Sequence, residues 1–200
     1  MIDYIVKDIT EVAGYLPLGI LCGFAAVVVY VICSKYIGSM HSPDTLTYPV
    51  ESGNMENEPA GERLRAVNVW RAVVWFLLTT YMAVLVITVF LSREPGSRQG
   101  IDMTLFGTWG VTPQAHAFVI ENVLLFVPFG ILYPCAVHGI WRKLTVPCGC
   151  IISVMIELVQ LLTERGYCQL DDVVMNTAGC VAGYIIWKLS EKCLRKRKGN

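Results

Sequence analysis

Five stretches of the chain are almost entirely apolar, and each is long enough to cross a bilayer as a helix. A hydrocarbon core of about 30 Å is spanned by about 20 apolar residues in helical conformation. The pattern therefore predicts the fold class: an all-α, polytopic membrane helix bundle with about five transmembrane helices. The predicted spans run from about Gly14 to Cys33, Trp70 to Leu91, Ala117 to Val137, Leu144 to Thr163 and Val173 to Leu189.

The composition supports a lipid environment for this bundle. Hydrophobic residues make up 54% of the chain and charged residues 16%, with a mean hydropathy of +0.53, whereas a soluble domain of this size needs more charge to cover its surface. The net charge is zero, which argues against a nucleic-acid partner, because phosphate binding needs a basic face. Of the eight cysteines, Cys148 and Cys150 lack the spacing of a zinc site. We interpret the cysteines as packing residues in helices and expect no cofactor.

The placement of lysine and arginine predicts the orientation. If the C-terminus is cytoplasmic, twelve of the 16 basic residues lie inside and only Lys7, Arg93, Arg98 and Arg165 lie outside. Membrane proteins concentrate their basic residues in the cytoplasmic loops. We therefore predict a multi-pass protein of the cell membrane with its N-terminus outside and its C-terminus in the cytoplasm.

Four segments follow from these spans. Residues 1–37 form an N-terminal transmembrane helix, and residues 38–69 form a flexible cytoplasmic linker rich in proline, glycine and acidic residues. Residues 70–191 form a four-helix membrane domain. Residues 192–200 form a basic cytoplasmic tail, which either binds anionic lipid of the inner leaflet or serves only as a topology signal.

Polar side chains inside the last three spans are the candidates for function, because such residues are costly in lipid and usually mark an internal site. The third span carries Glu121 and Asn122, followed by Pro128, which should kink the helix. The fourth span carries a stripe of polar residues at helical spacing: Ser153, Glu157, Gln160 and Glu164. The fifth begins a similar series, which consists of Asp172, Asn176, Gly179 and Gly183.

The predicted depths place the polar groups of three helices at one level near the outer surface. Each amide taken singly is as well explained by an interhelical hydrogen bond, but several carboxylates together need a cation, protonation or a basic ligand group. We expect Arg165 to pair with Asp171 or Asp172, while catalytic and metal-binding roles remain unassigned. The predicted functional cluster consists of Asn122, Glu157, Gln160, Arg165, Asp171, Asp172 and Asn176.

Three segments of the second half resemble the VanZ-like membrane protein family. They are Asn122-Val-Leu-Leu-Phe-Val-Pro-Phe-Gly130, then Glu157-Leu-Val-Gln160, and finally Arg165-Gly166 continuing through Leu170-Asp171-Asp172 to Asn176 and Gly179. The resemblance implies an integral membrane protein of the type associated with resistance to the glycopeptide teicoplanin. The chain departs from the family pattern in two places: the segment 101–106 lacks a proline, and Gln169 stands where an acidic residue is common.

Three functions remain open from the sequence. The first is an envelope interaction protein whose outer cluster binds a glycopeptide, a cell-wall precursor or a lipid headgroup. The second is a membrane enzyme on a lipid-linked diphosphate, in which Glu157 and Asp172 act as acid and base or hold Mg²⁺ together with Asp171. The third is a structural subunit. The GxxxG pair Gly179 and Gly183 also suggests a homo-oligomer, in which a second copy packs closely against the fifth helix.

Overall fold

The computed structural model describes residues 2–40, 60–91, 94, 96, 100–107 and 112–198. Most of the linker predicted at 38–69 therefore lies outside the described residues, as do the last two residues of the tail. The helices are α1 (Ile2–Gly14), α2 (Leu16–Met40), α3 (Ala60–Val86) with a π-helical end η2 (Ile87–Leu91), α4 (Pro113–Ala136), α5 (Ile140–Lys143), α6 (Thr145–Leu162) and α7 (Leu170–Lys198). Two short strands are β1 (Ile101–Asp102) and β2 (Cys168–Gln169).

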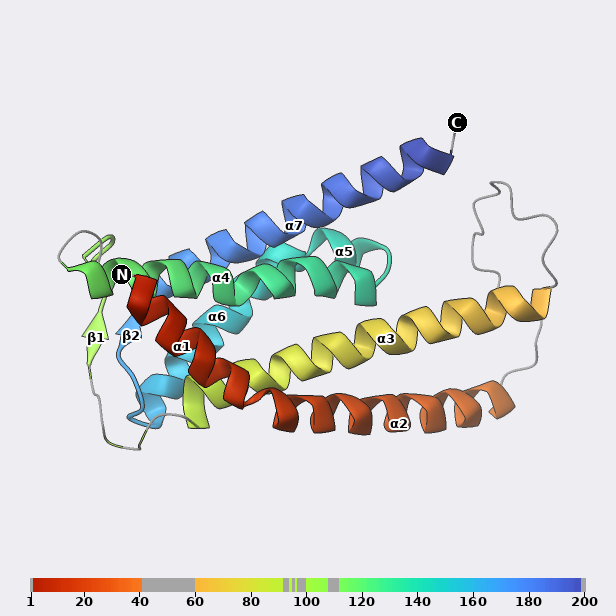
Figure 1. Cartoon of the computed structure of the whole chain (residues 1–200), viewed down its shortest axis with the longest axis horizontal. Coiled ribbons are helices and arrows are strands. Elements are labelled where there is room, and N and C mark those ends of the chain that lie inside the picture. Colours follow the sequence, from red (N-terminus) through yellow and green to blue (C-terminus); the bar gives the residue numbers. More distant parts are fainter. Residues whose placement is uncertain are drawn as a thin grey trace.

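The long helices run roughly side by side along one axis, which confirms the predicted all-α membrane bundle (Figure 1). Among the described residues, four helices are long and apolar enough to cross a membrane: Leu16–Cys33, Val69–Leu91, Pro113–Ala136 and Thr145–Leu162. The fifth predicted span lies within α7, which is helical throughout but carries Asn176 and a basic C-terminal half that lower its hydropathy. α2 packs along α3, and α7 packs along α4.

A short amphipathic helix, α1, precedes the first span and was not predicted. Its half-buried residues Ile5, Asp8 and Val12 face the bundle, while Ile2 and Ile9 are exposed. Pro17 stands in the first turn of α2, a position where its missing N–H is not needed. The N-terminal segment is therefore two helices, of which only the second is a membrane span.

The contact between α4 and α7 depends on three glycines. A side chain at Gly179 would collide with the backbone of Val123, one at Gly183 with the backbone of Val127, and one at Gly130 with the carbonyl of Cys180. The backbones thus approach as closely as small residues allow in a membrane. The surface that we expected to bind a second copy through Gly179 and Gly183 is covered by α4 of the same chain.

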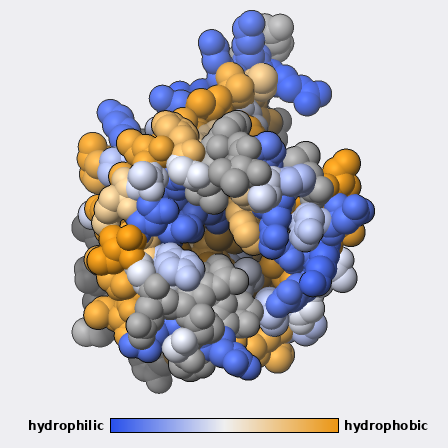
Figure 2. Space-filling view, turned by 90° about the vertical axis from the view of Figure 1, so that its left-hand side faces the viewer, coloured by the Kyte–Doolittle hydropathy of each residue, from blue (hydrophilic) through white to orange (hydrophobic). Residues whose placement is uncertain are grey.

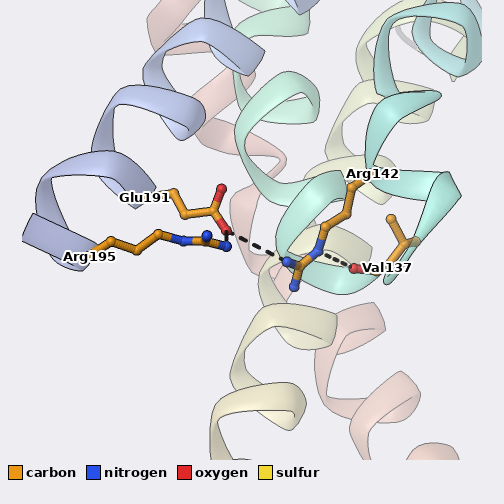
Figure 3. Close-up of polar contacts among 4 residues, drawn as sticks. All are labelled: Val137, Arg142, Glu191 and Arg195. Atoms are coloured by element: carbon orange, nitrogen blue, oxygen red, sulfur yellow. Dashed lines mark hydrogen bonds and ion pairs between the residues drawn. The ribbon is translucent and has the colours of Figure 1, made fainter. Parts of the chain in front are cut away.

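Near the C-terminal end of α7, charged side chains join α7 to α5 (Figure 3). Arg142 Nε donates to the carbonyl of Val137 at 2.9 Å, its Nη1 lies 3.8 Å from the Glu191 carboxylate, and Arg195 Nη2 approaches the same carboxylate at 3.2 Å. The guanidinium of Arg142 also lies 5.8 Å from the ring centre of Trp187. Exposed pairs of this kind contribute about 0.2–1 kcal/mol each, so they orient the helix end more than they stabilise the fold.

Gly179→Val is the sharpest test of the α4–α7 contact. The new methyl groups meet backbone atoms of α4 that cannot rotate away, and overpacking of this kind costs about 1–3 kcal/mol or more. We expect a lower melting temperature in detergent. Ala178→Val, at the neighbouring exposed position, is the control and should melt like the parent protein. Equal melting of the two variants would contradict the packing described here.

Candidate functional site

A cavity of about 640 Å³ lies at the end of the bundle where α1, β1 and β2 gather. We call this the cavity end. Its walls come from α1, α3, α4, α6 and α7, together with the loop that leads from α6 to α7. Viewed from this end, hydrophilic residues surround a hollow in which hydrophobic residues are visible (Figure 2). The volume is typical of a small-molecule site.

Six of the seven residues of the predicted functional cluster line this cavity. The helical spacing brings them together because Glu157 and Gln160 lie on the buried stripe of α6, while Asp172 and Asn176 lie one turn apart on α7. The six residues are Asn122, Glu157, Gln160, Asp171, Asp172 and Asn176. That they act together in one function stays a prediction.

Hydrogen bonds between helices hold the two asparagines of the cluster. Asn122 Nδ2 of α4 donates to Asp172 Oδ1 of α7 at 2.6 Å, and Asn176 Nδ2 donates to Ser153 Oγ of α6 at 2.9 Å. Asn176 is only 3% exposed, yet its carbonyl oxygen Oδ1 has no hydrogen-bond partner. A buried acceptor without a donor is costly, so this atom is positioned to accept a hydrogen bond from a molecule in the cavity.

The carboxylates Glu157 and Asp171 fasten the loops that frame the cavity. The backbone N–H of Gln169 donates to Glu157 Oε2 at 2.9 Å, and the N–H of Phe106 donates to Asp171 Oδ1 at 2.6 Å. Both carboxylates are nearly buried, at 3% and 4% exposure. Backbone donors therefore replace part of the hydration that these groups lose on burial.

The two departures from the family pattern lie next to each other in space. β1 and β2 form a parallel pair in which Ile101 faces Cys168 and Asp102 faces Gln169. Thr104 donates from its backbone N–H at 2.9 Å and from its hydroxyl to Asp102, and these bonds lower the pKa of the Asp102 carboxyl. The rim of the cavity therefore carries both sequence departures from the family pattern.

Cys168, at the same rim, has chemistry unsuited to a nucleophile. Burial and the nearby Glu157 carboxylate raise the pKa of its thiol, so that the reactive thiolate is disfavoured at neutral pH.

Arg165 is the residue of the cluster that the structure places elsewhere. Its Nη1 donates to the carbonyl of Phe90, in η2, at 2.6 Å, instead of to either aspartate, and the residue does not line the cavity. The preceding Glu164 is exposed and has a positive φ of 55°, which turns the chain away from the axis of α6. Our prediction assumed that the helix continues to Glu164, whereas α6 ends at Leu162. Arg165 fastens the α6–α7 loop to the end of the second span.

The cavity also has a wall that the sequence analysis missed. α1 contributes Asp8 and Glu11, Tyr15 follows directly after the last residue of α1, and Asp8 lies beside Glu121 of α4. The signal was present in the amphipathic pattern of residues 2–14, which alternates apolar and charged positions at helical spacing. With 13 residues, α1 is too short to cross a bilayer and so was not among the predicted spans.

The charge of the lining has one sign. Among the described residues that line the cavity, the charged side chains are all acidic: Asp8, Glu11, Glu121, Glu157, Asp171 and Asp172. They are distributed over four helices, and no three His, Cys, Asp or Glu side chains of the described chain converge closely enough to hold a metal ion. The arrangement can attract a cation larger than a metal ion but repels an anion.

These features define a multi-pass helical membrane protein with an acidic cavity at one end of its bundle. A family model described as VanZ/LLP1 matches residues 69–191, and the chain belongs to this family. It is 29% identical over 80 residues to Protein VanZ of Enterococcus faecium, an alignment that covers 40% of this chain and 50% of that protein. The chain thus spans about half the length of the curated relative it matches. No solved structure matches the chain.

The role of Arg165 as a fastener predicts a loss of stability on substitution. Arg165→Ala removes a hydrogen bond from a charged group and leaves the Phe90 carbonyl with one donor fewer, a change of about 1.5–3 kcal/mol. We expect an earlier thermal transition in detergent. Glu164→Gln, at the exposed neighbour, should melt at the parent temperature. An Arg165→Ala protein with an unchanged melting temperature would show that the contact with Phe90 contributes little to stability.

Proposed function

We propose that this protein binds a component of the cell envelope in its acidic cavity, at the outer face of the membrane, and thereby contributes to glycopeptide resistance of the teicoplanin type. The observation that carries the proposal is the convergence of six polar residues from three helices on one cavity. Burying carboxylates and amides in a membrane bundle without a ligand is expensive, so a binding role explains them better than a structural one.

The orientation is part of this proposal. The basic residues of α5 and of the end of α7 lie at the end opposite the cavity: Arg142, Lys143, Lys192, Arg195, Lys196 and Arg197. By the positive-inside rule this basic end is cytoplasmic, and the cavity end then faces the outside of the cell. A cavity at that face has access to glycopeptides, cell-wall precursors and the headgroups of the outer leaflet.

The alternative, an enzyme on a lipid-linked diphosphate, has weaker support. A diphosphate carries negative charge and would approach a lining whose described charged residues are all acidic. Its recognition normally relies on arginine, lysine or a helix N-terminus. The cavity is better suited to a ligand that donates hydrogen bonds.

Susceptibility of cells tests the proposed function. Asp172→Asn keeps the size of the side chain and its capacity to accept from Asn122, but removes its charge from the cavity. We expect cells that express this variant to lose the protection against teicoplanin that the parent protein provides, at equal amounts of protein in the membrane. Glu164→Gln removes an exposed carboxylate outside the cavity and should protect as the parent does.

Two results would refute the proposal. The first is a parent protein that gives no protection against any glycopeptide. The second is an Asp172→Asn variant that protects fully, because the cavity charge would then be irrelevant to the effect. Quantification of the protein in isolated membranes shows whether a lack of protection comes from a lack of protein.

A further inference from the structure

We infer that the ligand of the cavity is an amphiphile whose head carries a protonated primary amine. The inference rests on the proposed function and adds to it the chemical class of the bound molecule. Four observations on the described residues support it: the sign of the charges, the nature of the unpaired atoms, the spacing of the carboxylates and the apolar part of the lining.

The unpaired atoms of the cavity wall are acceptors. Asn176 uses its NH₂ group on Ser153, which leaves the buried Oδ1 without a donor, and Glu121 Oε1 is likewise buried without a partner. Asn122 uses its NH₂ group on Asp172. The NH₂ groups of both asparagines are thus engaged with protein atoms, while the free acceptors call for a ligand that supplies donors, and a primary ammonium supplies three.

The carboxylates favour a cation over a neutral donor. Glu121 of α4 lies beside Asp8 of α1, and two neighbouring carboxylates repel each other unless they share a proton or a cation. Asp172 stands one turn above Asn176 on α7, so that charge and free acceptor occur on one wall. The carboxylates do not converge on a single point, which suits an ammonium with several donors better than a bare metal ion.

Part of the lining is apolar, and it calls for a hydrocarbon portion of the ligand beside the ammonium. α3 contributes Val84 and Leu85, α4 contributes Leu125 and Pro128, and α6 contributes Ile156. The Tyr81 hydroxyl is engaged there with the carbonyl of Leu125 at 2.9 Å. A hydrocarbon chain satisfies this surface, whereas a small hydrophilic amine would leave it wet.

This chemistry has two sources, an aminophospholipid of the bilayer and an amine-bearing envelope component such as a glycopeptide. The experiment uses three probes with one chain length and different heads: dodecylamine, dodecanol and dodecyl sulfate. Their binding to the full-length protein in a non-ionic maltoside detergent is measured by native mass spectrometry. Phosphatidylethanolamine, phosphatidylglycerol with the same acyl chains, and teicoplanin form the second series, which separates the two sources.

We expect dodecylamine to bind at least about tenfold more tightly than dodecanol, and dodecyl sulfate to bind weakest, because removal of one member of a buried charge pair has an effect of this size. Glu121→Gln and Asp172→Asn should each reduce the preference for the amine, while Glu164→Gln should preserve it. A protein that binds the three heads equally, or binds the sulfate best, overturns the inference.

The outcomes for the two proposals are distinguishable. If Asp172→Asn abolishes teicoplanin protection in cells but the purified parent protein shows no preference for the amine, the inference fails and the proposed function stands. If the amine preference is present and cells gain no protection, the cavity chemistry stands and the link to resistance fails. A melting curve of each variant excludes loss of fold as the cause of either result.

Discussion

The close contact between α4 and α7 is the constraint on which the cavity depends. Glycines at 130, 179 and 183 let the two backbones meet without intervening side chains. At this separation Asn122 Nδ2 reaches Asp172 Oδ1 at 2.6 Å. A side chain at any of the three glycines would push the helices apart and separate the two halves of the polar site.

The cavity resolves a conflict that buried carboxylates create in a membrane protein. A carboxylate in a low-dielectric interior needs donors or a counter-charge. Two of the six carboxylates in the lining, Glu157 and Asp171, accept from backbone N–H groups. These donors are available because the β1–β2 pair holds the segments that contain Phe106 and Gln169 across the end of the bundle. Glu121 Oε1 and the amide oxygen of Asn176 have no such donor. Backbone N–H groups of the loops thus bind Glu157 and Asp171. Glu121 Oε1 and Asn176 Oδ1 are left to accept hydrogen bonds from a molecule in the cavity.

Hydrophobic length and helical spacing made much of this architecture predictable from the sequence. The bundle followed from apolar stretches of about bilayer thickness, and the stripe on α6 placed Glu157 and Gln160 on the buried side. Depth arguments then brought six of the seven cluster residues to one cavity.

The features that could not be predicted depend on loops and on helix ends. The position of Arg165 was predicted wrongly because Glu164 adopts a positive φ at the turn. A positive φ in a non-glycine residue cannot be predicted from a simple residue pattern. The intramolecular use of Gly179 and Gly183 was missed because a GxxxG pair does not specify whether its partner helix belongs to the same chain. The contribution of α1 was missed because a short amphipathic helix lacks the length of a membrane span.

Substituted-cysteine accessibility tests most directly whether the acidic cavity faces the outside of the cell. Gln169 lines the cavity and is half-buried at its rim. A Gln169→Cys protein in a Cys168→Ser background is treated in intact cells with membrane-impermeant methanethiosulfonates of opposite charge. We expect modification from outside the cell, and a faster reaction with the cationic reagent than with the anionic one. Modification only after permeabilisation, or a faster reaction with the anionic reagent, would contradict this expectation.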